Sequence, residues 1–180
     1  MDLLIFCIFI FKVKYTCIIL YILLKGFFMK NFGLYLKSIL FPVIVGRVVG
    51  LIISNFMDYN TLVKPPLAPP SILFPIMWTI LYILMGISYG ILKSNYKVDM
   101  DVKFIYFLQL GVNALWSIFF FVCKLRLFSF VWILLLALLV FIMIIKFYQK
   151  NKVAGLLQIP YLLWVLFASY LNFGFYLLNS

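Results

Sequence analysis

The chain contains no histidine and very few acidic residues, so the usual parts of several kinds of active site are missing. Without histidine, there is no side chain that ordinarily acts as a general base near neutral pH. Without paired carboxylates, the chain lacks the ligands of hard metal ions and the parts of a buried proton relay. We therefore expect no metal site, no obligatory cofactor, no conventional hydrolysis and no cation-coupled transport. Only four of the 180 residues are acidic, and all lie outside the five apolar segments described below: Asp2, Asp58, Asp99 and Asp101.

Cysteine is also scarce, and no nucleic-acid-binding pattern is present. Of the three cysteines, only Cys123 lies in the main apolar region, so no disulfide framework is expected. The net charge of +11 could suggest a nucleic-acid partner. However, Lys and Arg stand at the ends of apolar segments rather than in a basic run, which is the distribution typical of membrane proteins. We therefore expect no nucleic-acid partner.

Apolar residues are what the chain has in excess. Hydrophobic residues make up 68% of it and the mean hydropathy is +1.23, whereas soluble domains contain roughly 45–50% apolar residues. The apolar runs are continuous and do not alternate, which argues against a membrane barrel. The sequence predicts one all-α integral membrane domain over residues 29–180, a five-transmembrane-helix bundle. Five segments reach the ~20 apolar residues that a membrane helix needs: 32–56, 71–92, 103–123, 127–147 and 153–178.

Residues 1–28 form a separate N-terminal hydrophobic segment whose role stays open. Lys12 and Lys14 interrupt it, Asp2 stands where a signal peptide would be positively charged, and no small-residue cleavage site is evident. Met29 begins a stretch that resembles an ordinary start. Three interpretations compete: a misassigned start upstream of Met29, an extra membrane helix, and an uncleaved anchor.

The distribution of Lys and Arg predicts the orientation of the bundle, because cytoplasmic loops carry the excess of these residues. One side of the bundle holds eight of them and the other side holds three. We therefore expect a multi-pass protein of the cell membrane, with the N-terminus of the five-helix unit in the cytoplasm. The eight are Lys30, Lys37, Lys93, Lys97, Lys103, Lys146, Lys150 and Lys152, and the three are Lys64, Lys124 and Arg126.

A proline-rich loop leads directly into the second apolar segment. Four prolines within six residues hold the backbone in an extended, semi-rigid path. A stiff loop next to an aromatic helix is an arrangement expected of a ligand pocket with a lid. The predicted lid consists of Lys64, Pro65, Pro66, Pro69 and Pro70.

Three of the predicted helices carry aromatic or amide side chains on one face, because these residues recur every three or four positions. Packing between helices, with Asn and Ser in hydrogen bonds, explains each face taken singly. All three faces place such groups in the half of the membrane beneath the proline-rich loop. Together they favour an apolar pocket with few polar groups, suited to a flat hydrophobic ligand. The residues are Trp78, Tyr82, Met85 and Tyr89; Asn113, Trp116, Ser117 and Phe120; and Trp164, Ala168, Leu171 and Asn172.

The chain resembles the TspO/translocator protein family, also known as tryptophan-rich sensory proteins. Four blocks match the family in order and cover roughly residues 34–178. The resemblance implies a five-helix bundle, often a homodimer, with a pocket closed by the first loop. The blocks are VGRVVGLI with Gly46 and Gly50; Tyr59 with KPPLAPP and WTILYILMG; QLGVNALWSIFFF; and IPYLLWVLFASYLN.

The resemblance also implies a ligand and the residues that bind it. Members of the family bind porphyrins and other tetrapyrroles, and bacterial members are linked to tetrapyrrole sensing, stress responses and light-dependent porphyrin breakdown. The expected partners are thus a porphyrin or haem-type tetrapyrrole, or another hydrophobic molecule, and membrane lipid. Three functions stay open: a sensory or binding protein, a light-dependent porphyrin-degrading enzyme that uses Trp78 and Trp164, and a transporter. Carried over by position, the ligand-binding residues are Tyr59, Trp78, Asn113, Ser117, Trp164 and Ala168, to which the helical spacing adds Trp116.

The chain departs from the family pattern at several positions. Asp58 and Leu67 stand where the family often has tryptophan. No basic residue follows Lys152, so the cholesterol-recognition pattern near the end of the last helix is absent. These departures favour a prokaryotic, sterol-independent member in the inner membrane.

Arg47 is a further candidate for ligand binding, because it lies inside the first predicted helix, where a charge is costly. It could meet an anionic group such as a propionate. Snorkelling and pairing with helix-end carbonyl groups are the alternatives. In the same helix and the next one, Gly46 with Gly50 and Gly86 with Gly90 permit close approach of helices. We interpret them as packing sites within the bundle first and as dimer sites second.

Overall fold

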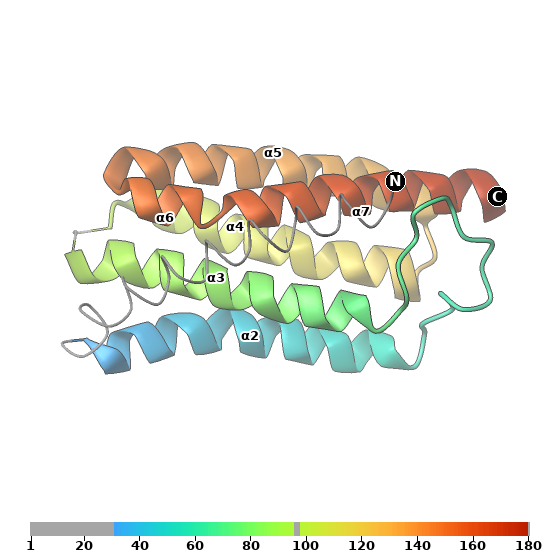
Figure 1. Cartoon of the computed structure of the whole chain (residues 1–180), viewed down its shortest axis with the longest axis horizontal. Coiled ribbons are helices and arrows are strands. Elements are labelled where there is room, and N and C mark those ends of the chain that lie inside the picture. Colours follow the sequence, from blue (N-terminus) through green and yellow to red (C-terminus); the bar gives the residue numbers. More distant parts are fainter. Residues whose placement is uncertain (1–30, 96–97, 180) are drawn as a thin grey trace.

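The structure is a computed structural model that describes residues 31–95 and 98–179, so the predicted N-terminal segment 1–28 lies outside the described residues. The described part consists of helices and loops without strands, and five helices are long and apolar enough to cross a membrane. They run side by side along the long axis of the molecule (Figure 1). The predicted all-α five-helix membrane bundle is confirmed. The elements are α2 (Phe32–Ser54), α3 (Leu73–Asn95), α4 (Met100–Ser117) with its π-helical continuation η1 (Ile118–Val122), α5 (Arg126–Lys150), the short α6 (Lys152–Leu156) and α7 (Ile159–Asn179).

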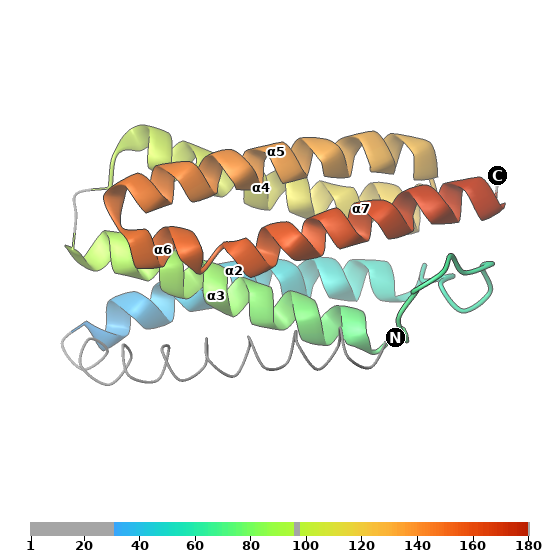
Figure 2. The same cartoon turned by 45° about the horizontal axis from the view of Figure 1, so that its top comes forward.

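The helices are arranged in pairs. In Figures 1 and 2, α2 and α3 lie together at one edge of the bundle, and α5 and α7 lie together at the other. The long loop 55–72 lies at one end, beside the C-terminal part of α7. We call this the loop end, and we call the opposite end, where α3 finishes and α4 begins, the far end.

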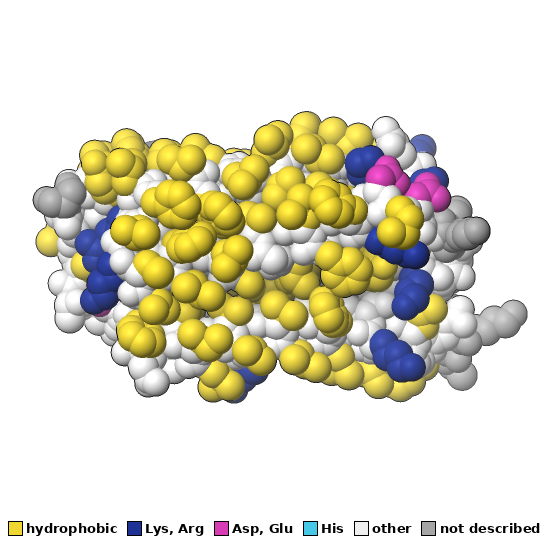
Figure 3. Space-filling view, turned by 180° about the vertical axis from the view of Figure 1, so that it is seen from behind, with side chains coloured by type: hydrophobic (Ala, Val, Ile, Leu, Met, Phe, Trp, Pro, Cys, Tyr) yellow, Lys and Arg dark blue, Asp and Glu magenta, His cyan; other side chains and the backbone are white. Residues whose placement is uncertain are grey.

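All five membrane-spanning helices expose hydrophobic side chains between the two ends of the bundle. In Figure 3, hydrophobic side chains cover the middle of the face, and most Lys and Arg side chains gather towards its ends. The outward side of α2 is especially apolar, with Leu51 65% and Ile44 55% exposed. Such a surface is stable against lipid chains and not against water.

α2 and α3 pack closely because glycines leave room for the neighbouring helix. A Cβ atom on Gly86 would lie 2.7 Å from the carbonyl oxygen of Ser38, and one on Gly46 would overlap the ring of Tyr82. The predicted packing role of these two glycines is confirmed. Gly50, by contrast, has open space around it, with no atom within 4 Å. A role of the glycines in a homodimer stays a prediction.

The third span changes from α-helix to π-helix where it reaches the loop end. The N–H group of Cys123 donates to the carbonyl oxygen of Ile118, five residues earlier (3.0 Å). This spacing defines a π turn, which contains one residue more than an α turn. The apolar pattern of segment 103–123 did not predict this change.

The predicted segment 153–178 is divided into α6 and α7. α6 ends at Leu156, and α7 begins at Ile159, with Pro160 in its first turn, where a missing N–H group is tolerated. The hydroxyl group of Ser88 in α3 donates to the carbonyl oxygen of Ala154 (2.6 Å), which holds α6 against α3. The divided segment still crosses the membrane once, over Lys152–Asn179.

Candidate ligand-binding site

A small cavity lies inside the loop end of the bundle and is lined mainly by aromatic side chains. Its volume is only about 20 Å³, which is room for little more than one water molecule. The first loop, α3, α4 with η1, and α7 all contribute to its wall. The lining residues are Tyr59, Phe74, Trp116, Phe120, Phe121, Ala168, Leu171, Asn172 and Phe175.

The aromatic rings around the cavity contact one another edge to face. The ring centroid of Tyr59 lies 5.1 Å from that of Phe74 and 5.4 Å from that of Phe175. Phe175 in turn lies 6.1 Å from Phe120, and Phe120 lies 4.8 Å from Phe121. These distances and tilts are those that aromatic pairs prefer. The loop, α3, α7 and η1 are thereby joined by one set of rings around the cavity.

Trp78 and Trp164, both predicted to bind the ligand, lie one ring away from the cavity. The ring of Trp78 is 5.9 Å from that of Trp116, and the ring of Trp164 is 6.1 Å from that of Phe74. Trp116 and Phe74 line the cavity, whereas the two predicted tryptophans do not. The indole N–H group of Trp164 is buried without a hydrogen-bond partner in the described part of the chain. Few buried donors in proteins are left in this state.

Asn113 lies in a chain of buried hydrogen bonds below the cavity. Its amide nitrogen donates to the hydroxyl group of Tyr161 (2.6 Å), and its amide oxygen accepts from Tyr82 (3.2 Å). Tyr161 donates to the amide oxygen of Gln109 (2.9 Å), whose nitrogen donates to the sulfur of Met85 (3.2 Å). Both ends of the Asn113 amide are thus used between helices, as the packing alternative expects. Its contact with a ligand stays a prediction.

The remaining predicted side chains of the helices are partly brought together. Trp116 and Ala168 line the cavity, whereas Ser117 is buried beside it and does not. With its amide oriented to satisfy both ends, Asn172 accepts from the indole N–H group of Trp116 (3.0 Å) and donates to the carbonyl oxygen of Arg126 (2.9 Å). Asn172 therefore fixes the orientation of one cavity-lining ring.

Arg47 lies away from these residues, on the exposed side of α2. It is not among the residues that line the cavity, and it makes no hydrogen bond or ion pair within residues 31–95 and 98–179. A guanidinium group on the outside of the bundle can extend along the helix towards the lipid headgroups. The snorkelling alternative fits this placement better than a contact with a ligand in the cavity.

The proline-rich loop is attached to its surroundings through two tyrosines. The hydroxyl group of Tyr59 donates to the carbonyl oxygen of Pro69 (2.5 Å), and that of Tyr170 in α7 donates to the carbonyl oxygen of Pro66 (3.0 Å). The ammonium group of Lys64 lies 4.8 Å from the ring centre of Tyr59. Burial raises the pKa of the Tyr59 hydroxyl group, so it stays a neutral donor to a higher pH than an exposed tyrosine. Tyr59 therefore connects the predicted lid with the wall of the cavity.

Pro65 is the buried proline of the loop and packs on α7. It lies against Gly174, where an added Cβ atom would approach Pro65 Cβ to 2.6 Å. Glycine at this position lets the loop lie directly on the helix. Leu67, by contrast, is 70% exposed and has a φ of 64°.

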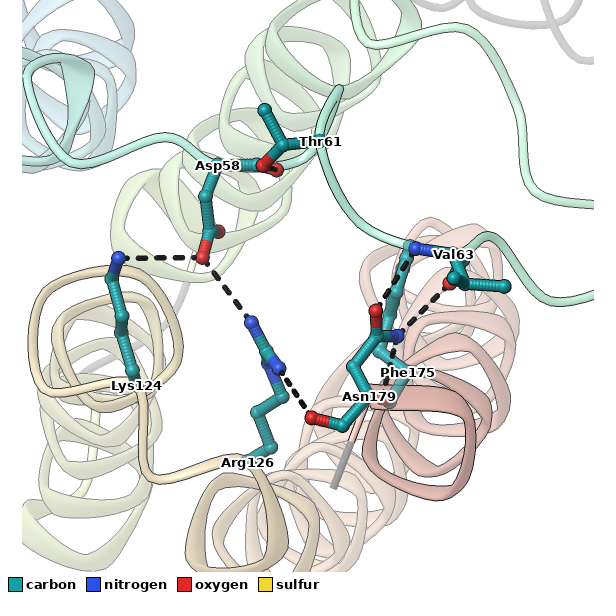
Figure 4. A network of polar contacts seen from close by, with 7 residues as sticks. All are labelled: Asp58, Thr61, Val63, Lys124, Arg126, Phe175 and Asn179. Carbon is teal, nitrogen blue, oxygen red and sulfur yellow. Dashed lines mark hydrogen bonds and ion pairs between the residues drawn. The ribbon is translucent and has the colours of Figure 1, made fainter.

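A polar network holds the first half of the loop to the helix ends (Figure 4). A carboxylate oxygen of Asp58 lies 3.2 Å from a guanidinium nitrogen of Arg126 and 3.5 Å from the ammonium nitrogen of Lys124. Arg126 also donates to the backbone carbonyl oxygen of Asn179 (3.3 Å). The side-chain amide of Asn179 accepts from the N–H group of Val63 (2.9 Å) and donates to its carbonyl oxygen (3.0 Å). The first half of the loop is thus bound to α5 and α7.

Some lining residues were not predicted from the sequence. Phe175 continues the face that holds Ala168 and Leu171, so an extension of that face would have found it. Phe121 directly follows Phe120, and α-helical spacing gives no reason for both to face one cavity. Phe74 precedes the predicted aromatic face of its helix by one turn.

The cavity offers apolar surface and aromatic faces rather than groups for acid–base chemistry. Within the described residues, no group of three or more His, Cys, Asp or Glu side chains could hold a metal ion. These rings can stack on a flat, mainly apolar molecule that displaces the lining side chains.

Residues 38–177 match the family model described as the TspO/MBR family. The chain is 46% identical over 123 residues to the tryptophan-rich protein TspO of Archaeoglobus fulgidus, covering 68% of this chain and 80% of the relative. It is 30% identical over 167 residues to the tryptophan-rich protein TspO of Bacillus cereus, covering 92% and 98%. It is 33% identical over 124 residues to the translocator protein of Ovis aries, covering 67% and 73%.

Proposed function

Because the chain belongs to the TspO/MBR family, we propose that it is a membrane sensory or binding protein for a flat, hydrophobic tetrapyrrole such as a porphyrin. The observation that carries the proposal is the cavity of aromatic rings beneath the proline-rich loop. Aromatic rings supply both apolar area and stacking geometry for a planar ligand. Binding in this place couples the ligand to the loop, and a change in the loop is a signal that a sensory protein can transmit.

In this proposal, Tyr59, Trp116 and Ala168 contact the ligand directly. The space inside the cavity, about 20 Å³, is far below the roughly 300–1,000 Å³ of small-molecule sites. The lid Lys64–Pro70 or the aromatic wall must therefore move to admit a porphyrin. Such a movement brings the ligand towards Trp78 and Trp164, and the unpaired indole N–H group of Trp164 is a donor for a polar atom of the ligand.

Titration of the purified protein with protoporphyrin, followed by absorbance, tests the proposal. We expect a saturable change in the porphyrin spectrum. Tyr59→Ala and Trp116→Ala should weaken binding several-fold because each removes a ring from the wall. Phe141→Ala is the matched control, since this ring is 51% exposed on the outside of α5. A spectrum that does not saturate with the unchanged protein refutes the proposal.

Light-dependent breakdown of the bound porphyrin is the second candidate function. It is favoured by the position of Trp78, whose ring lies 5.7 Å from that of Tyr82 and 5.9 Å from that of Trp116. These rings form a continuous aromatic contact from the cavity into the bundle. Illumination of the complex distinguishes the candidates: loss of porphyrin in light that Trp78→Phe suppresses indicates breakdown, whereas equal stability in light and darkness indicates binding alone.

For localisation, we propose the inner membrane of a prokaryote, with the start of α2 in the cytoplasm. The support is the excess of basic residues at the far end, including Lys93, Lys103 and Lys146, over those at the loop end. Alkaline phosphatase fused after the last residue tests this orientation. An active fusion is expected, because α7 ends at the loop end and the enzyme matures outside the cytoplasm. The opposite orientation is indicated if the phosphatase fusion is inactive while a fluorescent protein fused at the same position is fluorescent.

A further inference from the structure

We infer that Phe120 and Phe121, held side by side by the π-helical turn η1, limit the size of the ligand that the cavity admits. The inference rests on the proposed function in one respect, namely that this cavity takes up a flat hydrophobic molecule. It assigns size selection to the α4 wall, separately from the loop and from the tryptophans.

The first support is the position of the two rings. Phe120 and Phe121 are only 6% and 8% exposed, and both line the cavity. Their ring planes stand at 82° to one another with the centroids 4.8 Å apart. Phe120 also stacks on Trp116 (5.9 Å) and contacts Phe175 of α7 (6.1 Å). The pair therefore fills the space between the α4 wall and α7.

The second support is the backbone, which explains why two consecutive side chains face the same cavity. In an α-helix, successive side chains point roughly 100° apart. The π turn holds an extra residue, so successive side chains are rotated less, and both phenylalanines point inward. Its irregular end is marked by a hydrogen bond from the N–H group of Leu125 to the carbonyl oxygen of Phe119 (3.1 Å).

The residue that follows the turn region also departs from regular backbone. Lys124 has a φ of 56°, in the left-handed region that side chains other than glycine seldom occupy. A residue in this conformation directly after a helix commonly ends it, whereas π turns occur frequently at functional sites. Here the irregular segment has a definite result: it places one more ring in the cavity than a continuous α-helix would.

The consequence is a size limit that opening of the loop does not remove. The loop covers the cavity from the end of the bundle, whereas Phe120 and Phe121 occupy its side. A small planar molecule requires little displacement of the two rings. A tetrapyrrole fits only when the two rings are displaced, and that displacement reduces its affinity.

The test compares planar probes of increasing size on the full chain in detergent: indole, pyrene and protoporphyrin. Dissociation constants are measured by fluorescence or absorbance for Phe120→Ala, Phe121→Ala and the unchanged protein. We expect the preference for the larger probes over indole to rise about tenfold or more in either variant. The matched control is Phe119→Ala in the same turn, because that ring packs on Trp132 and Phe128 (5.0 Å each) and not on the cavity. Its size preference should stay unchanged.

Each outcome decides the inference. An unchanged size preference in both cavity variants, or an equal change in Phe119→Ala, overturns it. If an alanine variant does not fold, Phe120→Leu or Phe121→Leu must show a smaller change in the same direction. A shift between indole and pyrene without any porphyrin binding supports size selection while refuting the proposed porphyrin function. If no probe binds to any variant, both proposals fail.

Discussion

The two ends of the bundle are closed in different ways. At the far end, two ion pairs join the start of α4 to the end of α5, Asp101 with Lys146 and Asp99 with Lys150, and their side chains are 33–59% exposed. At the loop end, the side chains of Asp58 and Arg126 are only 20% and 15% exposed. Exposed ion pairs contribute little to stability. The less exposed pair of Asp58 and Arg126, in which Arg126 also donates to a backbone carbonyl oxygen, holds the first loop in a defined position.

Packing shows the same contrast. At the far end, the rings of Tyr89 and Tyr106 stack with centroids 4.2 Å apart, and Gly155 lies directly on the backbone of Tyr148. The loop end has a cavity, a π turn and a long loop instead. Segments that open for ligands have few packing contacts of their own and are held by specific polar bonds. The comparison agrees with the proposal that the loop end binds the ligand while the far end maintains the fold.

The largest effect is expected from the loop prolines. Replacing Pro65, Pro66, Pro69 and Pro70 with Ser should speed porphyrin release about tenfold or more. Each proline restricts the conformations of the open loop and thereby raises its free energy by ~0.4–1 kcal/mol, so the serine variant opens more readily. The melting temperature without ligand should fall only modestly, because the change removes the packing of Pro65 on Gly174 but leaves the contacts between helices. Stopped-flow release measures the first and a thermal scan the second. Pro75→Ala in α3 is the control. If the release rate of the four-serine variant is unchanged, the loop only connects two helices and does not act as a lid.

The next effect concerns the polar network at the loop end. Arg126→Ala should destabilise the closed loop by ~1–3 kcal/mol, because it removes charge-assisted hydrogen bonds to Asp58 and Asn179. Hydrogen exchange of the amides between residues 58 and 67 should accelerate accordingly. Lys124→Ala is the matched control, since its ammonium group lies 3.5 Å from the same carboxylate but its side chain is 55% exposed. If the loop amides exchange equally fast in both variants, the partly buried ion pair at the loop end contributes no more than an exposed one, and the contrast between the two ends is wrong.

A smaller effect is expected at Tyr59. Tyr59→Phe keeps the ring in the cavity wall but leaves the carbonyl oxygen of Pro69 without its donor. Loss of one such bond costs ~0.5–1.5 kcal/mol. Porphyrin affinity and loop protection should fall together by that amount. If affinity falls while hydrogen exchange does not change, the hydroxyl group acts on the ligand and not on the loop.

The smallest effect is expected at the far end. Lys146→Ala removes the exposed ion pair with Asp101, and neither the melting temperature nor porphyrin release should change measurably. A clear loss of stability in this variant would show that the far end also depends on its charges, and the contrast would have to be given up.

The membrane spans and the loop could be predicted from the sequence because each depends on local composition. Continuous apolar runs of ~20 residues predict spans wherever they occur, and four prolines in six residues predict a stiff loop without knowledge of its neighbours. Helical spacing likewise placed Trp116 and Ala168 on the inward faces that line the cavity. It predicted the same for Trp78 and Trp164, which the structure instead places one ring away from the cavity. The reason is that helical spacing gives the direction of a side chain but not its depth relative to a cavity.

What the sequence by itself determined is therefore the class of the protein: five apolar helices, a rigid loop and three aromatic faces. Only the tertiary structure decided which atoms meet. The pairing of Asp58 with Arg126 joins residues 68 positions apart, and the amide of Asn113 is taken up by tyrosines from two other helices. Contacts of this kind depend on how helices rotate and shift against one another. The π turn that brings Phe121 into the cavity could not be predicted either, because a local apolar pattern is equally satisfied by an α-helix, and the contact of Phe120 with Phe175 of α7 exists only in the folded bundle.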